Sequence, residues 1–452
     1  MASSPLTLIP LDFIPDLLAL HQQQPDYYPH LLSSTAVSKT ARYDILFAAP
    51  QQTLCLRQQQ LFLDGQALTE TDFLDQLDQL WQKNQQHIAV TDLPFSGGWF
   101  IYLSYELAAQ VEPSLKLPAT DDNLPSAFAC RFPAAIIVDR LQGKAQIICE
   151  AGFGNTFAKI QQDCAQLLAE LEIADLQIAD LQEDDEQTYF EQFDKLQQYI
   201  VEGDVFQVNL SRRWQTQLQQ PVSHASLFKR LSKANPGPFN ALATFGEQAV
   251  ISSSPERLIE VRNGLVQTRP IAGTRPRSQN KNDDESLSSE LMAHPKERAE
   301  HIMLIDLERN DLGRICEAGS VDVNELMVLE SYSHVHHIVS NVRGKLRDNV
   351  SPGEVIRAVF PGGTITGCPK VRCMEILAEL EQQGRSAYTG SLGYLNHDGS
   401  MDLNILIRTL IRDGDQLKFR AGGGIVVDSN AQRELQETRA KAKGLIVALK
   451  EK

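Results

Sequence analysis

Three tight-turn signals constrain the fold of this chain more than any other feature of its sequence. Asn263-Gly264, Asp398-Gly399 and Asp413-Gly414 each separate two apolar runs. Asn-Gly and Asp-Gly pairs favour two-residue β-hairpins, whose central residues need positive φ. The turns are expected to pair 257–261 with 265–269 and 404–411 with 416–420. Because helical patterns alternate with these hairpins, the chain is predicted to be α+β.

The remaining elements divide the chain into two regions. A hairpin is expected from 134–139 and 145–149, and a helix follows over about 158–172. The acidic stretch 173–187 is typical of a solvated linker. A capping box of Thr188 and Glu191 predicts the start of the next helix. The predicted organisation is an N-terminal region 1–172, a linker 173–187 and a C-terminal region 188–450.

Composition excludes several classes of protein. The net charge of -16 disfavours a nucleic-acid or anionic-membrane partner, because few cations could neutralise phosphates. The chain has seven cysteines and no C-x-x-C motif, which favours free thiols in a reducing cytoplasm over disulfides or zinc. It shows no evident signal peptide and no apolar run long enough to span a bilayer. These features indicate a cytoplasmic protein.

Two predicted helices carry matching pairs of glutamates. Glu297 and Glu300 follow Pro295 in one helix, and Glu434 and Glu437 follow a plausible Ser429 cap in another. Residues three apart share one face of a helix. Two such helices facing each other would offer carboxylates to Mg²⁺, although exposed pairs of this kind are common on solvated helices.

An arginine and a glycine run suggest an anion site. Arg408 lies in the run 404–411, which is apolar on both faces of the predicted strand. Its guanidinium is therefore expected to be buried. A buried guanidinium needs an anion, which can be a structural carboxylate or a ligand. Backbone N–H groups of Gly422, Gly423 and Gly424 could bind a carboxylate, or the glycines could form a bulged strand.

Two residues are candidate proton-transfer groups. Glu256 lies between two strand-like runs, and His337 alternates with Val335 and Val339 on one face. Either side chain can transfer protons if its pKa is tuned, although a histidine beside valines is more often a core residue. The segment 362–370 only superficially resembles a phosphate loop, because Cys368 and Pro369 separate its glycine from its lysine.

These features occur in stretches that resemble one family, the chorismate-utilising enzymes. The resemblance covers about residues 188–450, and more loosely 31–34 and 94–98. Its segments are 203–210, 254–257, 269–277, 297–300, 306–312, 336–340, 361–370, 401–408 and 421–424. The resemblance implies the family's fold, in which antiparallel sheets form a sandwich flanked by helices.

The resemblance also implies a metal site and a role for each proton-transfer group. Glu300 and Glu437 would bind Mg²⁺ directly, and Glu297 and Glu434 would assist through water. The metal would bind the ring carboxylate of chorismate. Glu256 would protonate the hydroxyl that leaves C4, and His337 would orient groups or transfer protons near the ring.

The remaining substrate contacts are also implied by the family motifs. Arg408 would bind the enolpyruvyl carboxylate. The residues expected to bind the rest of the substrate are Gly273, Thr274, Tyr388, Gly422, Gly423 and Gly424.

Two positions bear on which family reaction is expected. Members that add water carry a lysine where this chain has Gln207, so ammonia is the expected nucleophile, supplied by a glutamine amidotransferase partner. Ala272 replaces a lysine usual in aminodeoxychorismate-forming members, and alanine is typical of anthranilate synthases. The segments 362–370, 401–404 and 94–98 instead resemble the aminodeoxychorismate-forming members. We therefore expect aminodeoxychorismate formation for p-aminobenzoate and folate synthesis, without a covalent lysine intermediate, with anthranilate formation as the alternative.

Two other functions are compatible with particular segments. Ser34, Pro238 and Phe239 resemble a tryptophan pocket of relatives, so a tryptophan-sensing or non-catalytic binding role is conceivable. A nucleotide-binding role through 362–370 predicts that ATP protects the protein against heat, which the sequence does not favour.

Overall fold

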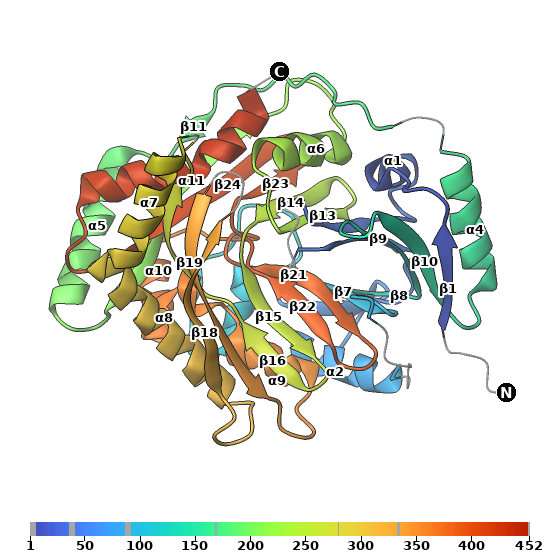
Figure 1. Cartoon of the computed structure of the whole chain (residues 1–452), viewed down its shortest axis with the longest axis horizontal. Helices are drawn as coiled ribbons and strands as arrows, with labels where there is room; N and C mark the ends of the chain where they lie inside the picture. The colour runs from blue at the N-terminus through green and yellow to red at the C-terminus, as the bar shows by residue number, and fades with distance from the viewer. Residues whose placement is uncertain are drawn as a thin grey trace.

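The chain folds into two large antiparallel sheets that pack face to face, with helices on their outer sides (Figure 1). The computed structural model describes residues 6–35, 41–85, 92–167, 170–278, 280–331 and 335–450. Each sheet has 12 strands. This architecture confirms the predicted sandwich of antiparallel sheets flanked by helices.

The first sheet joins strands from both ends of the chain. In spatial order its strands are β1 (Leu6–Leu11), β10 (Lys144–Glu150), β9 (Ala134–Asp139), β3 (Tyr43–Ala48), β2 (His30–Ser33), β13 (Phe239–Phe245), β14 (Gln248–Ser254), β23 (Thr409–Asp413), β24 (Gln416–Ile425), β12 (Gln207–Gln217) and β11 (Gln182–Glu183), with β20 (Gly367–Cys368) also paired to β12.

The second sheet is assembled in the same way. In spatial order its strands are β17 (Ile271–Pro276), β19 (Val335–Lys345), β16 (Leu265–Thr268), β15 (Arg257–Arg262), β22 (Met401–Asn404), β21 (Ser391–Asn396), β7 (Gly98–Leu103), β8 (Ala127–Phe132), β4 (Thr53–Arg57), β5 (Gln60–Leu63) and β6 (Gln66–Ala67), with β18 (Asp322–Ser331) also paired to β19. Both sheets therefore contain strands from the region before residue 173 and from the region after it. The N-terminal and C-terminal regions therefore share both sheets and do not form separate domains.

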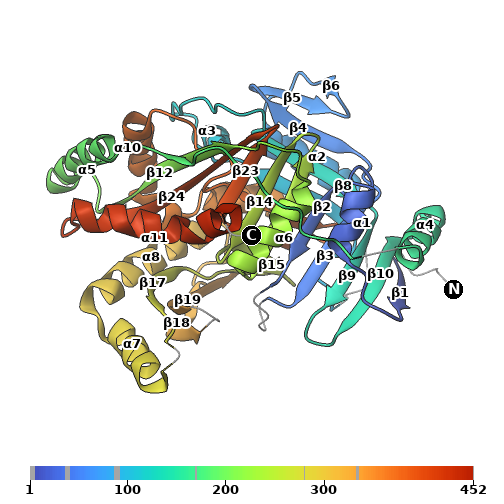
Figure 2. The ribbon, with the colours of Figure 1, turned by 90° about the horizontal axis from the view of Figure 1, so that it is seen from above.

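The helices cover the outer faces and one end of the sandwich (Figure 2). They are α1 (Leu17–Gln23), α2 (Phe73–Lys83), α3 (Ala108–Val111), α4 (Gly154–Ala165), α5 (Glu186–Val201), α6 (His224–Ala234), α7 (Lys281–Ala293), α8 (Pro295–Gly313), α9 (Pro352–Val359), α10 (Lys370–Glu381) and α11 (Ala431–Lys450). In Figure 1, α5, α7, α8, α10 and α11 gather at the end of the molecule opposite α4 and β1.

The apolar core has one layer between the sheets and further layers under the helices. Phe47 and Ile137 of the first sheet pack with Phe100 and Phe132 of the second. One cluster joins α1, α4, α6 and α11 to the first sheet, and another joins α2, α8 and α9 to the second. Full burial of one such side chain contributes about 1.5–3 kcal/mol, so these layers fix where each helix lies.

The predicted hairpins are largely confirmed. Asn263 and Gly264 have φ values of 54° and 72°, and they join Arg262 to its partner Leu265. The pairing of β9 with β10 and of β21 with β22 also agrees with the sequence. The prediction for 404–411 is wrong in one respect. Asn404 ends β22 of the second sheet, residues 405–408 are not in a strand, and Arg408 has a φ of 51°, so only β23 pairs with β24.

Two predicted helix starts are corrected by side-chain caps. The helix α5 begins at Glu186, because the Asp185 side chain accepts the Thr188 N–H at 2.9 Å. The helix α11 begins after Asn430, whose Oδ1 accepts the Arg433 N–H at 3.1 Å. The Ser429 hydroxyl instead accepts the Val426 N–H. Asp and Asn are strong N-cap residues, which explains why they define these starts.

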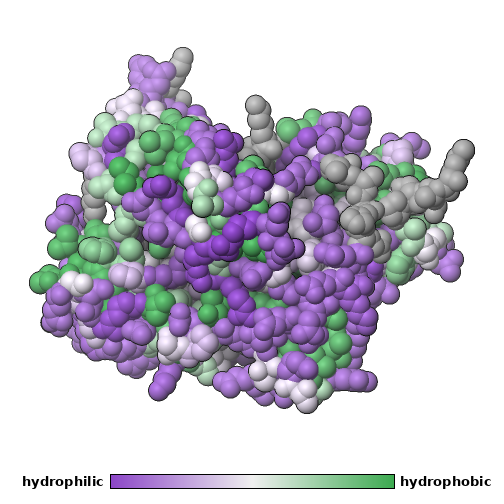
Figure 3. Space-filling model, turned by 90° about the horizontal axis from the view of Figure 1, so that it is seen from below, coloured by the Kyte–Doolittle hydropathy of each residue, from purple (hydrophilic) through white to green (hydrophobic). Residues whose placement is uncertain are grey.

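None of the described helices is both long and apolar enough to cross a membrane. Figure 3 shows a largely hydrophilic face with small groups of hydrophobic residues among the polar ones. All seven cysteines are free thiols.

Candidate active site

The glycine run at the end of β24 is the floor of the candidate site. Gly422, Gly423 and Gly424 pair with Ser211, Leu210 and Asn209 of β12. A Cβ built on Gly423 would lie 3.4 Å from Glu434 Oε2 and 3.7 Å from Glu437 Oε1. A Cβ on Gly424 would lie 3.4 Å from Glu300 Oε1. Glutamates from α8 and α11 therefore converge on this backbone, as the sequence predicts.

The fourth glutamate reaches the site beside another glycine. Gly273 has a φ of 68°, and a Cβ built on it would lie 2.7 Å from Glu297 Oε2. Arg275 forms an ion pair with Glu297 at 3.2 Å. The helix α8 begins at Pro295 as expected, with the His294 side chain as its N-cap. This start places both glutamates of α8 on its inner face.

The carboxylates are close enough to perturb one another. Burial raises the pKa of Glu300, the hydrogen bond from Gln207 opposes this shift, and the charges of Glu297 and Glu437 add to it. A cation would relieve this repulsion. Within the described part of the chain, no three or more His, Cys, Asp or Glu side chains form a group able to hold a metal ion by themselves. Mg²⁺ binds one or two carboxylates and keeps several waters, so a site with fewer than three such side chains is compatible with its chemistry.

Lys441 is a site residue that the motif analysis did not include. Its Nζ lies 2.8 Å from Glu437 Oε1 and donates to the Gly422 carbonyl oxygen at 3.0 Å. Its charge also lowers the pKa values of Glu256 and Glu300. The sequence signal was available, because Lys441 follows Glu437 by four residues on the same face of α11.

Arg408 lies at the bend between β22 and β23, not within a continuous strand. Its positive φ turns it out of the strand register, and its side chain is half-buried. Burial lowers the pKa of Arg408, and the charge of Glu256 opposes that shift. No carboxylate of the described residues forms an ion pair with it within 4 Å, so the guanidinium is available to an anionic ligand.

Glu256 is buried beside these cationic groups. Burial raises its pKa to about 7, opposed by the Thr364 hydroxyl and by the charges of Lys441 and Arg408. Among the described groups, its Oε1 has no hydrogen-bond partner. A buried carboxylic acid with a pKa near neutrality can donate a proton at physiological pH.

The strands β17 and β19 contribute His337 and its neighbours. Thr274 pairs with His337, and Ala272 pairs with Ile338. His337 is 3% exposed, and burial lowers its pKa to about 4, as does the nearby charge of Arg408. The imidazole is therefore neutral at pH 7. Ala272 is 5% exposed and offers only a methyl group.

Tyr388 and Gln207 also border the glycine floor. A Cβ on Gly422 would lie 2.7 Å from the Tyr388 hydroxyl oxygen. Burial raises the pKa of Tyr388 to about 12, so it remains a neutral donor. The Gln207 Nε2 donates to Glu300 Oε1 at 2.8 Å, which leaves its buried Oε1 without a partner among the described residues.

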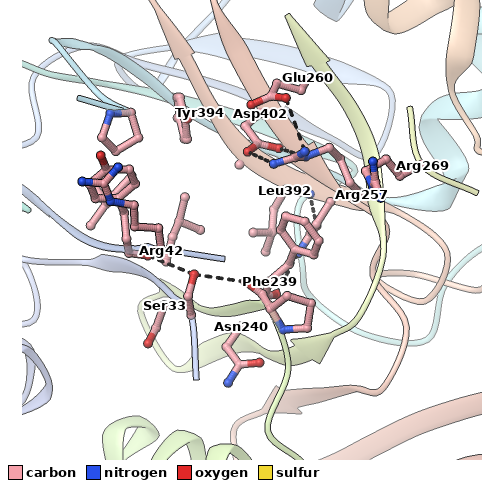
Figure 4. Close-up of a pocket in the computed structure, with 18 of the residues that line it drawn as sticks. Ser33, Arg42, Phe239, Asn240, Arg257, Glu260, Arg269, Leu392, Tyr394 and Asp402 are labelled. Atoms are coloured by element: carbon pink, nitrogen blue, oxygen red, sulfur yellow. Dashed lines mark hydrogen bonds and ion pairs between the residues drawn. The ribbon is translucent and has the colours of Figure 1, made fainter. Parts of the chain in front are cut away.

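A separate cavity of about 280 Å³ lies between the sheets, next to this site. Ser34, Pro238 and Phe239, the residues predicted for a tryptophan pocket, all line it. Figure 4 shows Arg42 and Arg269 on its walls together with the Arg257–Asp402 pair. Charges of both signs and aromatic rings therefore surround one space.

The segment 362–370 does not present its lysine to a phosphate. Lys370 Nζ lies 2.5 Å from Asp311 Oδ2 and donates to the Val359 carbonyl oxygen at 3.3 Å. The backbone between Gly363 and Ile365 forms a short 3₁₀ turn against α8. The geometry therefore gives no support to a nucleotide site here.

The comparisons with known proteins agree with this geometry. A family model described as "chorismate binding enzyme" matches residues 31–447. An anthranilate synthase component I-like protein of Synechocystis is 42% identical over 79% of this chain and 73% of its own. Aminodeoxychorismate synthase component 1 of Salmonella typhimurium is 37% identical over 96% of both chains.

A solved structure extends the likeness to the fold. Anthranilate synthase component I from Streptococcus pneumoniae superposes with a TM-score of 0.80 and 31% identity, over 90% of this chain and 92% of that one. Relatives of both names occur at similar identity, so identity alone does not separate the two reactions. The matched model, the close relatives and the fold together show that this chain belongs to the family of chorismate-binding enzymes.

Proposed function

We propose that this protein is the chorismate-binding component of an aminodeoxychorismate synthase, which replaces the C4 hydroxyl of chorismate with ammonia. The observation that carries the proposal is the convergence of four glutamates, Arg408 and Glu256 around the glycine floor. Chorismate is a dianion with a poor leaving group. Its displacement requires cations at the carboxylates and a proton at the departing hydroxyl.

Mg²⁺ is proposed as the cofactor, with Glu300 and Glu437 as direct ligands and Glu297 and Glu434 assisting through water. When bound, the cation would neutralise the ring carboxylate of the substrate. Burial is the main cause of the raised pKa of Glu300, and repulsion from Glu297 and Glu437 adds to it; a bound cation would relieve that repulsion. Lys441, already bound to Glu437 and Gly422, is proposed to contribute a second positive charge.

The other side chains have proposed roles at specific atoms. Arg408 binds the enolpyruvyl carboxylate, and Glu256 donates its proton to the C4 oxygen as the C–O bond breaks. His337, neutral at pH 7, orients groups near the ring. The backbone of Gly273 and Gly422–Gly424, with Thr274 and Tyr388, positions the ring.

Ammonia is the proposed nucleophile, delivered by a glutamine amidotransferase partner. Gln207 cannot act as a general base for water, since its amide does not accept a proton at neutral pH. The Gln207 Nε2 already donates to Glu300, whereas its Oε1 has no partner among the described residues. That oxygen can accept a hydrogen bond from ammonia.

Ala272 implies a route without a covalent enzyme intermediate. A methyl group cannot form an adduct at C2. We propose that ammonia adds first at C2 to give aminodeoxyisochorismate, and that a second ammonia adds at C4 and expels the first.

Product identification tests the reaction. Purified protein with chorismate, MgCl₂ and ammonium chloride is expected to form a product that yields p-aminobenzoate only after a separate lyase is added. Direct appearance of fluorescent anthranilate would assign the alternative reaction, namely anthranilate synthase component I. Absence of any product would favour a binding-only role.

The second cavity supports an additional proposal, that it binds a free amino acid such as tryptophan. Its arginines and its Asp402 and Glu260 carboxylates match the two charges of a zwitterion, and its aromatic rings match an indole. Titration calorimetry with tryptophan should show 1:1 binding, while isoleucine serves as the control. Equal heats for both amino acids would contradict recognition of an indole.

A further inference from the structure

A further cavity, of about 410 Å³, lies beside two hairpin turns of the first sheet. The helices α1 and α6 lie side by side on the outer face of that sheet and form part of its wall (Figure 2). The Ser223 hydroxyl, at the start of α6, donates to Gln22 Oε1 of α1 at 2.7 Å. The turns that join β13 to β14 and β23 to β24 form the rest of the wall. In the described part of the chain, this cavity shares no lining residue with the one between the sheets or with the candidate active site.

The first residues of α6 offer hydrogen-bond donors to this cavity. His224 and Ala225 line it, and their backbone N–H groups have no acceptor among the described residues. The Ser223 side chain caps the helix by accepting the Ser226 N–H at 3.1 Å, so it leaves the other two N–H groups free. Free N–H groups at the start of a helix carry partial positive charge and attract anions. This part of the wall therefore favours a carboxylate.

Arg412 of β23 adds a full positive charge to the same cavity. Its Nε donates to the Gly414 carbonyl oxygen at 2.8 Å, and its Nη1 donates to the Val222 carbonyl oxygen and lies 3.4 Å from His224 Nδ1. Burial and the charge of Arg412 lower the pKa of His224 to about 4, so this imidazole is a neutral acceptor. Among the described residues, the Arg412 Nη2 has no partner and no carboxylate forms an ion pair with the guanidinium. Neutral groups thus orient the guanidinium, and its charge is available to an anion.

His21 of α1 offers an acceptor to the cavity. It is 2% exposed and lies on the wall. Its Nδ1 lies 2.7 Å from the Tyr28 carbonyl oxygen, which can only accept, so Nδ1 carries the ring proton. Burial lowers the pKa of His21, which keeps the ring neutral at pH 7. Its Nε2 is then an acceptor without a partner among the described residues, and buried polar atoms are rarely left in that state.

Negative charge completes the wall. Glu247 and Asp415 are exposed residues of the two turns and both line the cavity. Their charges act on Arg412, although neither forms an ion pair with it. No Phe, Tyr or Trp side chain is among the described lining residues. The cavity therefore presents donors and positive charge to one group of a ligand, and acceptors and negative charge to another.

We propose that this cavity binds a small aliphatic α-amino acid. Its carboxylate accepts hydrogen bonds from the α6 N–H groups and from Arg412 Nη2. Its ammonium group donates to His21 Nε2 and faces Glu247 and Asp415. An inorganic anion would leave the imidazole acceptor unpaired and would be repelled by the two carboxylates. The lack of an aromatic side chain among the described lining residues separates this ligand from the tryptophan proposed for the cavity between the sheets.

Three probes of similar size distinguish the two halves of this recognition. L-Alanine carries both charged groups, L-lactate has a hydroxyl in place of the ammonium, and propionate keeps only the carboxylate. Differential scanning fluorimetry of the full chain, at neutral pH and constant ionic strength, compares them at about 20 mM. L-Alanine should raise the Tm by about 2 °C, and the other two by less than half as much. No shift with L-alanine, an equal shift with propionate, or a larger shift with sodium phosphate would overturn the proposal.

Variants of the wall locate the binding site. Calorimetric titration with L-alanine should show a Kd raised by about tenfold or more in Arg412→Gln. His21→Asn keeps a donor for the Tyr28 carbonyl oxygen but removes the Nε2 acceptor, and should raise the Kd by about threefold or more. Arg343→Gln removes an exposed guanidinium of the second sheet and should bind like wild type. Wild-type affinity in both Arg412→Gln and His21→Asn would overturn the proposal.

Binding is measured without chorismate, so the result is independent of the reaction that the protein catalyses. The comparison of the three probes uses wild-type protein, so it decides the question even if a variant does not fold. If anthranilate proves to be the product while L-alanine binds as expected, the proposed function fails and the amino-acid site stands.

Discussion

Glu256 and Arg257 are consecutive in the chain but belong to different sites. Glu256 lies among Arg408, Lys441 and Thr364 of the candidate active site. Arg257 lines the neighbouring cavity, where both its Nε and Nη2 donate to the Asp402 carboxylate at 2.9 Å. The proposed acid is therefore bonded in the chain to a residue that an ion pair holds in the adjacent cavity.

This relationship predicts the effect of Asp402→Asn. The change leaves the buried Arg257 guanidinium without its bidentate partner, which should lower the free energy of unfolding by about 3 kcal/mol. It should also lower kcat by displacing Glu256. Urea unfolding and steady-state kinetics provide the measurements. Asp322→Asn breaks an exposed pair with Arg343 and should cost less than about 1 kcal/mol.

The raised pKa of Glu256 predicts an alkaline limb in the pH profile. A general acid must be protonated, so kcat/KM should fall as pH rises through about 7. Glu256→Gln should lower kcat by about 100-fold or more and remove this limb, while Glu191→Gln, on the surface of α5, should leave it unchanged. A limb that persists in Glu256→Gln would assign the titration to another group.

The same shift predicts a pH dependence of stability. The folded protein binds the Glu256 proton more tightly than the unfolded chain does. Its contribution is therefore complete below pH 4.5, the ordinary pKa, and is lost as pH rises through about 7. The loss amounts to roughly 3 kcal/mol. Urea titrations from pH 4.5 to 8 measure the free energy of unfolding, which should depend less on pH in Glu256→Gln than in wild type. If the wild-type and Glu256→Gln proteins show the same pH dependence, the pKa of Glu256 is not raised.

Arg408→Gln is expected to weaken chorismate binding. Loss of a charge-assisted hydrogen bond of about 1.5–3 kcal/mol should lower kcat/KM by about 10- to 100-fold, mainly through KM. Arg309→Gln removes a half-exposed guanidinium from α8 and should have no effect. Unchanged KM for Arg408→Gln would place the enolpyruvyl carboxylate elsewhere.

Glu300→Gln and Glu437→Gln should raise the Mg²⁺ concentration needed for half-maximal activity by about tenfold or more, because each removes a proposed ligand charge. Calorimetric Mg²⁺ titration measures the same loss without turnover. Glu375→Gln, at the surface of α10, is the control. If all variants bind Mg²⁺ with the affinity of wild type, Glu300 and Glu437 are not its ligands.

Ala272 predicts that no covalent enzyme–substrate adduct forms. Intact-protein mass spectrometry after quenching with chorismate should show only the mass of the free chain. Ala272→Lys is not expected to improve kcat, since a long side chain must fit where a residue 5% exposed now packs. A stable adduct on wild-type protein would refute the two-addition route.

Sequence alone determined the parts of this protein that depend on local chemistry. Asn263-Gly264 selects its hairpin because both positions need positive φ, and Pro295 starts α8 because its missing N–H has no partner in the first helical turn. The family motifs predict the four glutamates and Arg408 as site residues, and these roles stay predictions. The starts of α5 and α11 were misplaced, because several residues near each start could cap the helix.

Tertiary structure decided the parts that depend on segments far apart in the chain. Gly424 meets Glu300 only because β24 pairs with β12 and α8 packs across that edge. The bend at Arg408 likewise arises from packing. Local propensities encode neither the distance between remote side chains nor their burial, and both quantities set the charges and pKa values on which the proposed chemistry depends.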